Sequence, residues 1–114
     1  MLPKENRLRN KKDFDRISTR GRQVSGNFLI LKFQSNELNL ARIGFVVSKK
    51  VSKKAVLRNK VKRRLREAVK RELVSLKPGF DLVFFTRREI KDREFSDIQQ
   101  AVKQLFEKAK LYNA

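Results

Sequence analysis

The sequence contains no cysteine, no histidine and no tryptophan. Without cysteine the chain can form neither disulfide bonds nor cysteine zinc sites, and without histidine it lacks the most frequent general base and transition-metal ligand. A reducing compartment fits this composition, so we expect a cytoplasmic protein. Glycine and proline are also scarce, with four and two residues. Because repeats and low-complexity tracts are missing too, the composition favours a folded domain.

Negative charge is in short supply as well. The 114 residues include 12 Asp and Glu against 30 Lys and Arg, which gives a formal charge of +18. The length suits one domain, and a surface with this excess of positive charge needs a polyanion as its partner. We therefore expect residues 1–114 to form a single nucleic-acid-binding domain. Within it, residues 1–9 are basic and lack an apolar run, which predicts a mobile basic arm rather than a secretory signal.

Long apolar runs are missing. The longest are 28–31 and 82–85, far short of the roughly 20 residues that cross a membrane, so no membrane association is expected. Alternating residues predict strands over 23–34 and 41–49, lying side by side, and the run 80–86 predicts a third, largely buried strand. Four aromatic residues are expected in the core: Phe33, Phe45, Phe84 and Phe85. The opposite sheet face would carry apolar and cationic groups suited to unpaired nucleotides, namely Phe28, Ile30, Lys32, Arg42 and Ser48.

Two short helices are indicated by their ends. Asn10 is a candidate N-cap for a first helix that stops at Gly21. Ser96, with Gln99 three residues later, has the spacing of a capping box and predicts the start of a last helix. Since these helices are interleaved with the strands, we expect an α/β protein in which one sheet is covered by helices.

A basic segment without acidic residues lies between Leu38 and Arg66. It contains eleven basic residues: Arg42, Lys49, Lys50, Lys53, Lys54, Arg58, Lys60, Lys62, Arg63, Arg64 and Arg66. Apolar residues at spacings of three and four predict a long helix here, capped near Ser52 and stopped by Pro78 and Gly79. On this helix a cationic row is expected on one face, formed by Arg58, Asn59, Lys62, Arg63 and Arg66. Such a row can neutralise phosphates, and unmixed like charges disfavour an ordinary solvated face.

The string 55–67 resembles the RNR motif of the bacterial ribonuclease P protein component, and 47–50 resembles that family's second signature. Further similarity lies in 7–8, 13–14 and 42–44, so the resemblance spans nearly the whole chain. It implies an α+β sandwich with the topology αβββαβα, a left-handed βαβ crossover and a ribosomal protein S5 domain 2-like fold. The crossover hand runs against the usual rule. The implied topology also splits 23–49 into three strands.

The resemblance assigns site residues in two groups. Contacts with the catalytic RNA subunit would come from Arg58, Asn59, Lys62, Arg63, Arg66, Lys49, Lys50, Lys53 and Lys54. The 5′ leader of precursor tRNA would lie in a cleft lined by Phe14, Ile30, Lys32, Val46 and Ser48. The sequence departs from the family pattern at Ser18 and Lys32, where relatives carry aromatic residues, and at 52–54, which replaces a shorter glycine-containing link.

The implied function is that of the protein subunit of ribonuclease P, an endoribonuclease that acts as a ribonucleoprotein. It would assist removal of the 5′ leader from precursor tRNA, with catalysis by the RNA subunit and Mg²⁺ bound mainly by that RNA. No catalytic or metal-ligating residue is therefore expected in the protein. Asp92, Glu94 and Asp97 are close in sequence, but they flank a helix start, where acidic residues favour the helix dipole. No protein partner is indicated.

Three alternatives remain open from the sequence. A ribosomal or rRNA-binding assembly protein could use the same cationic row. A self-sufficient metal-dependent nuclease would have to use the carboxylates, and a non-specific DNA-binding role is compatible with the charge alone.

Overall fold

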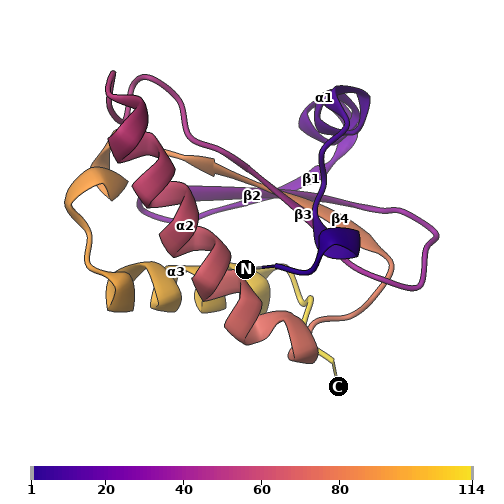
Figure 1. Ribbon diagram of the computed structural model, residues 1–114. Helices are drawn as coiled ribbons and strands as arrows, with labels where there is room; N and C mark the ends of the chain where they lie inside the picture. The colour runs from indigo at the N-terminus through magenta and orange to yellow at the C-terminus, as the bar shows by residue number, and fades with distance from the viewer. Residues whose placement is uncertain (1, 114) are drawn as a thin grey trace.

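Residues 2–113, which the computed structural model describes, form a four-stranded sheet with helices on both faces (Figure 1). Helix α1 lies on one face, and α2 and α3 cover the other. The helices are α1 (Lys11–Arg20), α2 (Ala55–Glu72) and α3 (Phe95–Lys108). The strands are β1 (Arg22–Ser25), β2 (Leu29–Ser35), β3 (Arg42–Val46) and β4 (Phe80–Thr86). Three short 3-10 turns lie at Lys4–Asn6, Leu73–Ser75 and Arg88–Asp92. This is the mixed α+β architecture implied by the family resemblance.

The strand order is β1-β2-β4-β3. β4 pairs antiparallel with β2 and parallel with β3. The prediction that the strands over 23–34 and 41–49 are neighbours is therefore wrong. β4 lies between them because its apolar centre, residues 82–84, is fully buried, and such a strand needs partners on both edges and cover on both faces. The implied split of this region into three strands is confirmed, since residues 26–28 form the turn between β1 and β2.

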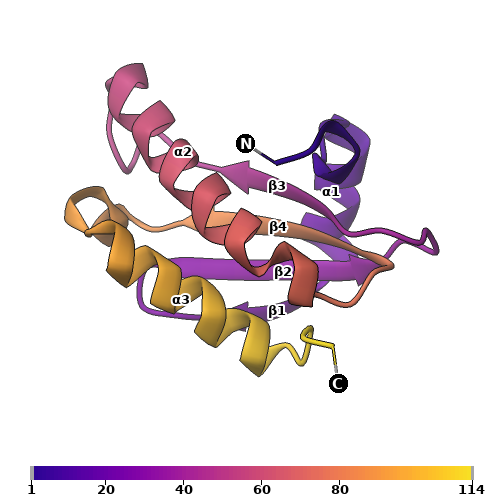
Figure 2. The ribbon, with the colours of Figure 1, turned by 60° about the horizontal axis from the view of Figure 1, so that its bottom comes forward.

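The connection from β3 through α2 to β4 is the left-handed crossover. In Figure 2, α2 lies on the viewer's side of the sheet, both parallel strands run from right to left, and β4 lies below β3. When this view is turned so that both strands point upward, β4 lies to the left of β3. The chain therefore passes from β3 through α2, in front of the sheet, to a strand on the left. Most crossovers between parallel strands move to the right. The local pattern of the sequence could not have supplied this hand, whereas the family resemblance did.

The sheet separates two apolar clusters. The larger lies under α2 and α3 and contains Leu31, Phe33 and Phe84 from the strands, together with Leu65 and Phe106 from the helices. The smaller lies under α1 and consists of buried Leu8, Ile17 and Val83, against which Phe14, Val46 and Phe85 pack. Fully burying such side chains contributes roughly 1.5–3 kcal/mol each. The two clusters fix the helices on both faces of the sheet.

Two aromatic residues, Phe28 and Phe85, lie on the opposite face of the sheet from the one predicted. Phe28 is buried in the larger cluster, with the Arg93 guanidinium 5.0 Å from its ring centroid. Phe85 is half-buried on the α1 face. Phe28 belongs to the turn before β2, where strict alternation has not yet begun. In β4, Asp81, Val83 and Phe85 share a face because strand side chains alternate. The core prediction is confirmed for Phe33 and Phe84, and half-buried Phe45 packs against the same cluster.

The first helix has the predicted ends, but the other two start differently. The Asn10 side chain accepts a hydrogen bond from the Lys12 N–H, and the Gly21 N–H closes the helix on Ile17. Helix α2 has Lys54 at its N-cap, while the Ser52 hydroxyl accepts from the Lys54 N–H. The capping box at Ser96 is absent, because the N-cap of α3 is Glu94, two residues earlier.

Gln99, the second residue of the predicted capping box, instead links the two helices under the sheet. Its side-chain amide donates to the Ala68 carbonyl and to a Glu72 carboxylate oxygen on α2, at 3.1 Å each. A side chain directed to a neighbouring helix cannot also cap its own. The spacing in the sequence therefore marks a contact between α2 and α3.

The N-terminal segment packs on the fold, which corrects the expectation of a mobile arm for residues 2–9. Leu2 is 1% exposed and Leu8 is 5% exposed. The Leu8 N–H donates to the Ile43 carbonyl at 2.9 Å, and the Asn6 side chain donates to the Ala41 carbonyl at 2.7 Å. The arm is basic, but its two leucines bury apolar surface against the sheet. Met1 lies outside the described residues. None of the helices in residues 2–113 has the length and apolar character needed to span a bilayer.

A buried carboxylate anchors α1 to the sheet. Asp81, on β4, is 0% exposed and accepts two hydrogen bonds from Arg42, at 2.8 and 2.7 Å. It also accepts one from Arg16 on α1 at 2.8 Å and one from Asn36 at 2.9 Å. Burial alone would raise the pKa of the Asp81 carboxyl, but the hydrogen bonds from Arg42, Asn36 and Arg16 outweigh it and lower the pKa below its ordinary value. The same pairing with Asp81 raises the pKa of the Arg42 guanidinium.

Replacing Asp81 with Asn should lower the free energy of unfolding by about 3 kcal/mol, because two arginines lose their buried partner. A group with a lowered folded pKa stabilises the protein above the unfolded carboxyl pKa, about 3.9, and this contribution disappears as the pH falls through the folded pKa. In thermal melts between pH 7 and 2.5, the melting temperature of the wild type should therefore fall more steeply with decreasing pH than that of Asp81→Asn. The matched control is Asp15→Asn, at an exposed position of α1. Equal stability of the two variants at pH 7 would contradict the anchoring role.

Candidate nucleic-acid interface

The predicted cationic row lies along the side of α2 that leads to the edge of the sheet. Val61, Leu65 and Val69, on the adjoining side of the helix, pack into the larger apolar cluster. In the row, Asn59 and Arg63 are exposed, and Arg58, Lys62 and Arg66 are half-buried. Within residues 2–113 no carboxylate forms an ion pair with this row. Its positive charge is therefore available to an external anion.

Arg58 differs from the rest of the row because its guanidinium is used inside the protein. Its Nη1 donates to the carbonyl oxygens of Ser52 and Lys53, at 2.9 Å each. These carbonyls belong to the loop between β3 and α2, which carries four predicted contact residues, all exposed: Lys49, Lys50, Lys53 and Lys54. Arg58 thus holds the basic loop against the start of α2.

The predicted leader cleft corresponds to the α1 face of the sheet. Ile30, Phe85 and Val46 form a row across β2, β4 and β3, because each pairs with the next in register. Lys32 lies in the following row with Val83 and Gly44. The structure brings Ile30, Val46 and Phe14 together on this face. Ser48 lies beyond the end of β3, where its hydroxyl accepts from the Lys50 N–H.

Phe85 is the residue that the sequence reasoning missed. It lies at the centre of the apolar row and is only half-buried. The signal was present in the alternation of β4, which places Phe85 on the same face as Asp81 and Val83. The apolar run 80–86 instead predicts a largely buried strand, which conceals this alternation.

The two departures from the family pattern contact each other. The Lys32 ammonium donates to the Ser18 carbonyl at 3.0 Å and lies 5.3 Å from the Phe85 ring centroid. A cation at this distance from an aromatic face is attracted by the ring quadrupole. The α1 face therefore combines an apolar row with a positive charge at its side.

Arg42 was predicted to be a free cation of this face, and that prediction is wrong. Its guanidinium is bound to Asp81, and it lies 3.9 Å from Asp13. The bidentate pair removes most of its capacity to bind a phosphate. The cations that remain near the face are Lys32 and those of α2 and the N-terminal segment.

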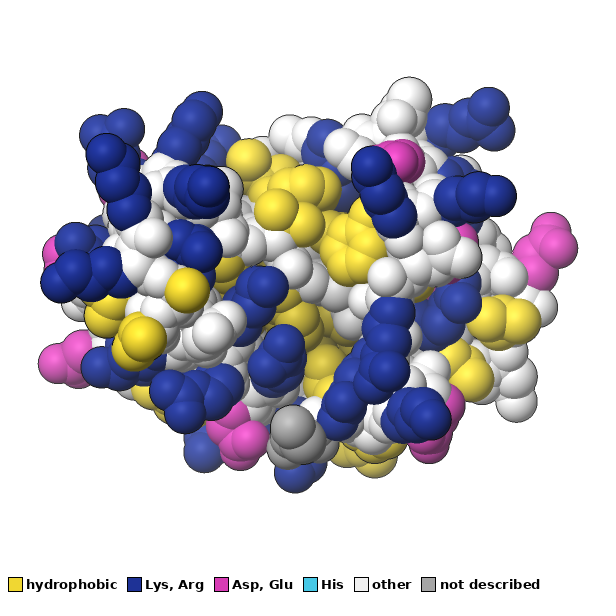
Figure 3. Space-filling model, turned by 45° about the horizontal axis from the view of Figure 1, so that its top comes forward, with side chains coloured by type: hydrophobic (Ala, Val, Ile, Leu, Met, Phe, Trp, Pro, Cys, Tyr) yellow, Lys and Arg dark blue, Asp and Glu magenta, His cyan; other side chains and the backbone are white. Residues whose placement is uncertain are grey.

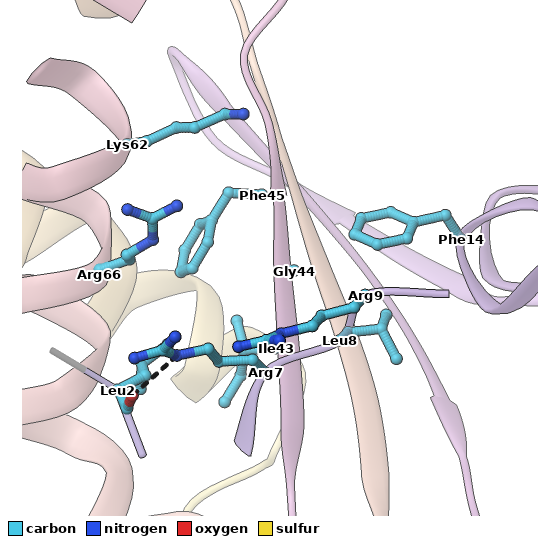
Figure 4. Close-up of a pocket in the computed structure, with 10 residues that line it drawn as sticks. All are labelled: Leu2, Arg7, Leu8, Arg9, Phe14, Ile43, Gly44, Phe45, Lys62 and Arg66. Atoms are coloured by element: carbon cyan, nitrogen blue, oxygen red, sulfur yellow. Dashed lines mark hydrogen bonds between the residues drawn. The ribbon is translucent and has the colours of Figure 1, made fainter. Parts of the chain in front are cut away.

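An open pocket at the edge of β3 connects the cationic row with the α1 face (Figure 4). Its volume is about 470 Å³. Four cationic side chains and two aromatic rings contribute to its wall: Arg7, Arg9, Lys62, Arg66, Phe14 and Phe45. Figure 3 shows apolar side chains in a hollow between groups of Lys and Arg. The two predicted site groups therefore form one continuous surface.

Phe14 lies against Gly44, and this contact requires glycine. A Cβ at position 44 would overlap the Phe14 ring, with Cε1 at 2.6 Å. Gly44 is on β3 and Phe14 is on α1, so the missing side chain lets the ring approach the strand. The segment 42–44 thus combines the arginine that binds Asp81 with the glycine that admits Phe14.

The acidic residues around the start of α3 are spread along the chain. In the part of the chain that the structure describes, no three carboxylates converge where they could hold a cation. Asp92, Glu94 and Asp97 lie at the end of a 3-10 turn and the first turn of α3, as their proximity to a helix start predicted. That the protein uses no metal or catalytic residue of its own stays a prediction.

Comparison with known proteins agrees with this geometry. The family model described as Ribonuclease P matches residues 2–110. A ribonuclease P protein component of Clostridium botulinum is 41% identical over 111 residues, covering 96% of this chain and 99% of the relative. One from Caldanaerobacter subterraneus is 33% identical over 112 residues, covering 98% and 96%.

Solved structures of RNase P proteins have the same fold as this chain. The RNase P protein of Staphylococcus aureus superposes with a TM-score of 0.86 at 32% identity, covering 95% of this chain and 98% of that one. The Thermotoga maritima protein gives 0.82 at 29% identity, covering 90% and 96%. Fold and surface define a small basic α+β protein in which a cationic helix adjoins an apolar sheet face. The chain belongs to the ribonuclease P protein family, and with that membership comes a role in tRNA processing.

Replacing Gly44 with Ala should displace the Phe14 ring and leave the fold intact, because the clash falls on the far end of a side chain. We expect a loss of about 1–2 kcal/mol in the free energy of unfolding. In a Phe14→Ala background the same replacement should cost much less, since no ring is left to displace. Chemical denaturation of the wild type, the two single variants and the double variant gives the coupling energy. Additive effects of the two replacements would contradict the contact.

Proposed function

We propose that this protein is the accessory subunit of ribonuclease P and assists removal of the 5′ leader from precursor tRNA. The α2 row and the loop held by Arg58 would bind the catalytic RNA subunit, while the α1 face would receive the single-stranded leader. The observation that carries this proposal is the pocket at the β3 edge, which joins the two surfaces. A protein that bridges two RNAs needs such adjacent surfaces, and its positive charge lowers the repulsion between them.

Each group of residues has a separate chemical task. Lys62, Arg63 and Arg66 neutralise phosphates, and the arginines can do so through two parallel hydrogen bonds. Asn59 adds a donor and an acceptor that can bind a sugar or a base. On the α1 face, Phe14 and Phe85 offer flat apolar surface for unstacked bases, and Lys32 can bind a neighbouring phosphate.

The hydrolysis itself belongs, in this proposal, to the RNA subunit with Mg²⁺. The protein residues fit that division of labour. Asp81 is saturated by its hydrogen bonds, so it has no free oxygen lone pair for a metal or a water molecule. Of the remaining side-chain carboxylates, Asp13 and Glu72 are half-buried and the others are exposed. The protein contributes binding and positioning, and the RNA would supply the metal ligands.

The decisive test is cleavage of a 5′-extended precursor tRNA at low Mg²⁺ by a bacterial ribonuclease P RNA, with and without the protein. We expect cleavage at the mature 5′ end when both components are present and none with the protein alone. If six to eight phosphates are neutralised, the log-log salt dependence of RNA-subunit binding should have a slope of about −5 to −7. Absence of stimulation would favour a ribosomal role, and cleavage by the protein alone would indicate a nuclease.

The double replacement Lys62→Gln with Arg66→Gln should weaken binding of the RNA subunit about tenfold or more and reduce the salt slope by about 2. The matched control is Lys60→Gln with Arg71→Gln, which removes the same charges from the other flank of α2. Filter binding at several salt concentrations measures both quantities. The assignment of the row fails if the two double variants lose the same affinity.

A further inference from the structure

β3 is an edge strand whose outer side is paired only at its beginning. Its inner side pairs with β4. On the outer side, Arg7 forms an isolated bridge with Ile43, and the Leu8 N–H donates to the Ile43 carbonyl at 2.9 Å. The N-terminal segment then leaves the edge to begin α1 at Lys11. Among residues 2–113, the part of β3 after Ile43 therefore has no backbone partner on its outer side.

The next outward-facing backbone groups are those of Phe45. Along a strand, the N–H and C=O of alternate residues point to opposite edges. Because Ile43 points outward to the N-terminal segment, Phe45 does so as well, whereas Gly44 points to β4. Within residues 2–113, no donor or acceptor outside the sheet bonds to the Phe45 N–H or C=O. A hydrogen-bond donor and an acceptor thus lie side by side on an open edge.

The pocket at the β3 edge surrounds these two groups. Figure 4 shows the Phe45 ring on the α2 side of β3 and the Phe14 ring on the other side, with Gly44 between them. Lys62 and Arg66 reach the pocket from α2, and Arg9 from the N-terminal segment. No carboxylate lines it. Its volume of about 470 Å³ lies within the roughly 300–1,000 Å³ range of small-ligand sites.

We propose that this pocket is a subsite for one unpaired nucleotide. The Phe45 N–H and C=O would bond the Watson–Crick edge of the base, where every base offers an adjacent donor and acceptor. The rings of Phe45 and Phe14 flank the base, and Lys62 and Arg66 hold its phosphate. This inference rests on the proposed function and adds a base-reading position outside the apolar row of Ile30, Phe85 and Val46.

An extended peptide could also pair with an open strand edge. The side chains favour the nucleotide, because four cations and no carboxylate surround the pocket, and each nucleotide brings a phosphate. A peptide would have to be acidic at nearly every position to match them.

The test uses the full chain and short single-stranded RNAs, each with one 4-thiouridine, followed by photo-crosslinking and mapping of the joined peptide. At one position of the RNA we expect crosslinks to Phe45 or Lys62. Crosslinks restricted to residues of the apolar row would overturn the subsite. An acidic ten-residue peptide that displaced the RNA at equal concentration would also overturn it, since the edge would then bind protein.

Replacing Phe45 measures how much the contact between its ring and the base contributes to RNA binding. Phe45→Leu keeps apolar volume and removes the flat ring, so binding of the short RNA should weaken about tenfold. The control is Phe80→Leu, another half-buried phenylalanine of the same sheet, which packs edge-on against Phe33. Melting curves of both variants measure any loss of folding. Equal RNA affinity of the two variants would contradict the proposal.

The last experiment uses an RNA with an abasic residue at the crosslinking position and compares its binding with that of the intact RNA. It should weaken binding to the wild type about tenfold and binding to Phe45→Leu less, because the ring contact is already missing there and only the backbone bonds to the base remain to be lost. Equal losses in both proteins would show that the base is not read here. The cleavage assay on the wild type tests the proposed function independently. If the protein stimulates cleavage and the crosslinks lie elsewhere, only this subsite fails.

Discussion

The buried carboxylate of Asp81 is the constraint on which the arrangement of the surface depends. A carboxylate without solvent contact is costly unless every lone pair is satisfied. Its partners come from three separate parts of the chain: Arg16 on α1, Asn36 after β2, and Arg42 on β3. Meeting this requirement fixes α1 on the sheet. Once α1 is fixed, Ile17 covers Val83 and Phe14 reaches Gly44, so the geometry of the α1 face follows from one buried charge.

The same network decides which positive charges are free. In a chain of formal charge +18, the two arginines nearest the centre of the α1 face are bound to Asp81 or Asp13. Cations available to an external anion are thereby concentrated on α2 and the loop before it. Helix α2 has no acidic residue in its first turn and follows Lys53 and Lys54, an arrangement that opposes the helix dipole. An anion bound there would relieve this repulsion and stabilise the fold.

The sequence predicted the local features of this fold well, but not its long-range contacts. Asn10 and Gly21 marked the ends of α1 because capping depends on neighbouring residues. The placement of β4 between β2 and β3 could not be predicted, since strand pairing joins residues far apart. Asp81 lies 39 residues from Arg42 and 65 from Arg16, and nothing local indicates that they meet. Phe28 was assigned to the wrong face because it lies in the turn before β2, where the alternation of the strand has not begun. Phe85 was assigned to the wrong face because the continuous apolar run of β4 hides the alternation of its side chains.

The cationic row could be predicted residue by residue from helical spacing and the family motif, yet its members are not equivalent. Arg58 belongs to the motif and also donates to two loop carbonyls, a contact that no spacing rule contains. Lys32 shows the converse, because it departs from the family pattern and still has a defined place. Its ammonium is held by the Ser18 carbonyl and by the Phe85 ring. A leader phosphate bound by Lys32 would replace the bond to Ser18 and leave the cation above the ring. In the proposed leader face, this chain therefore supplies a positive charge that Ser18 and Phe85 hold in place.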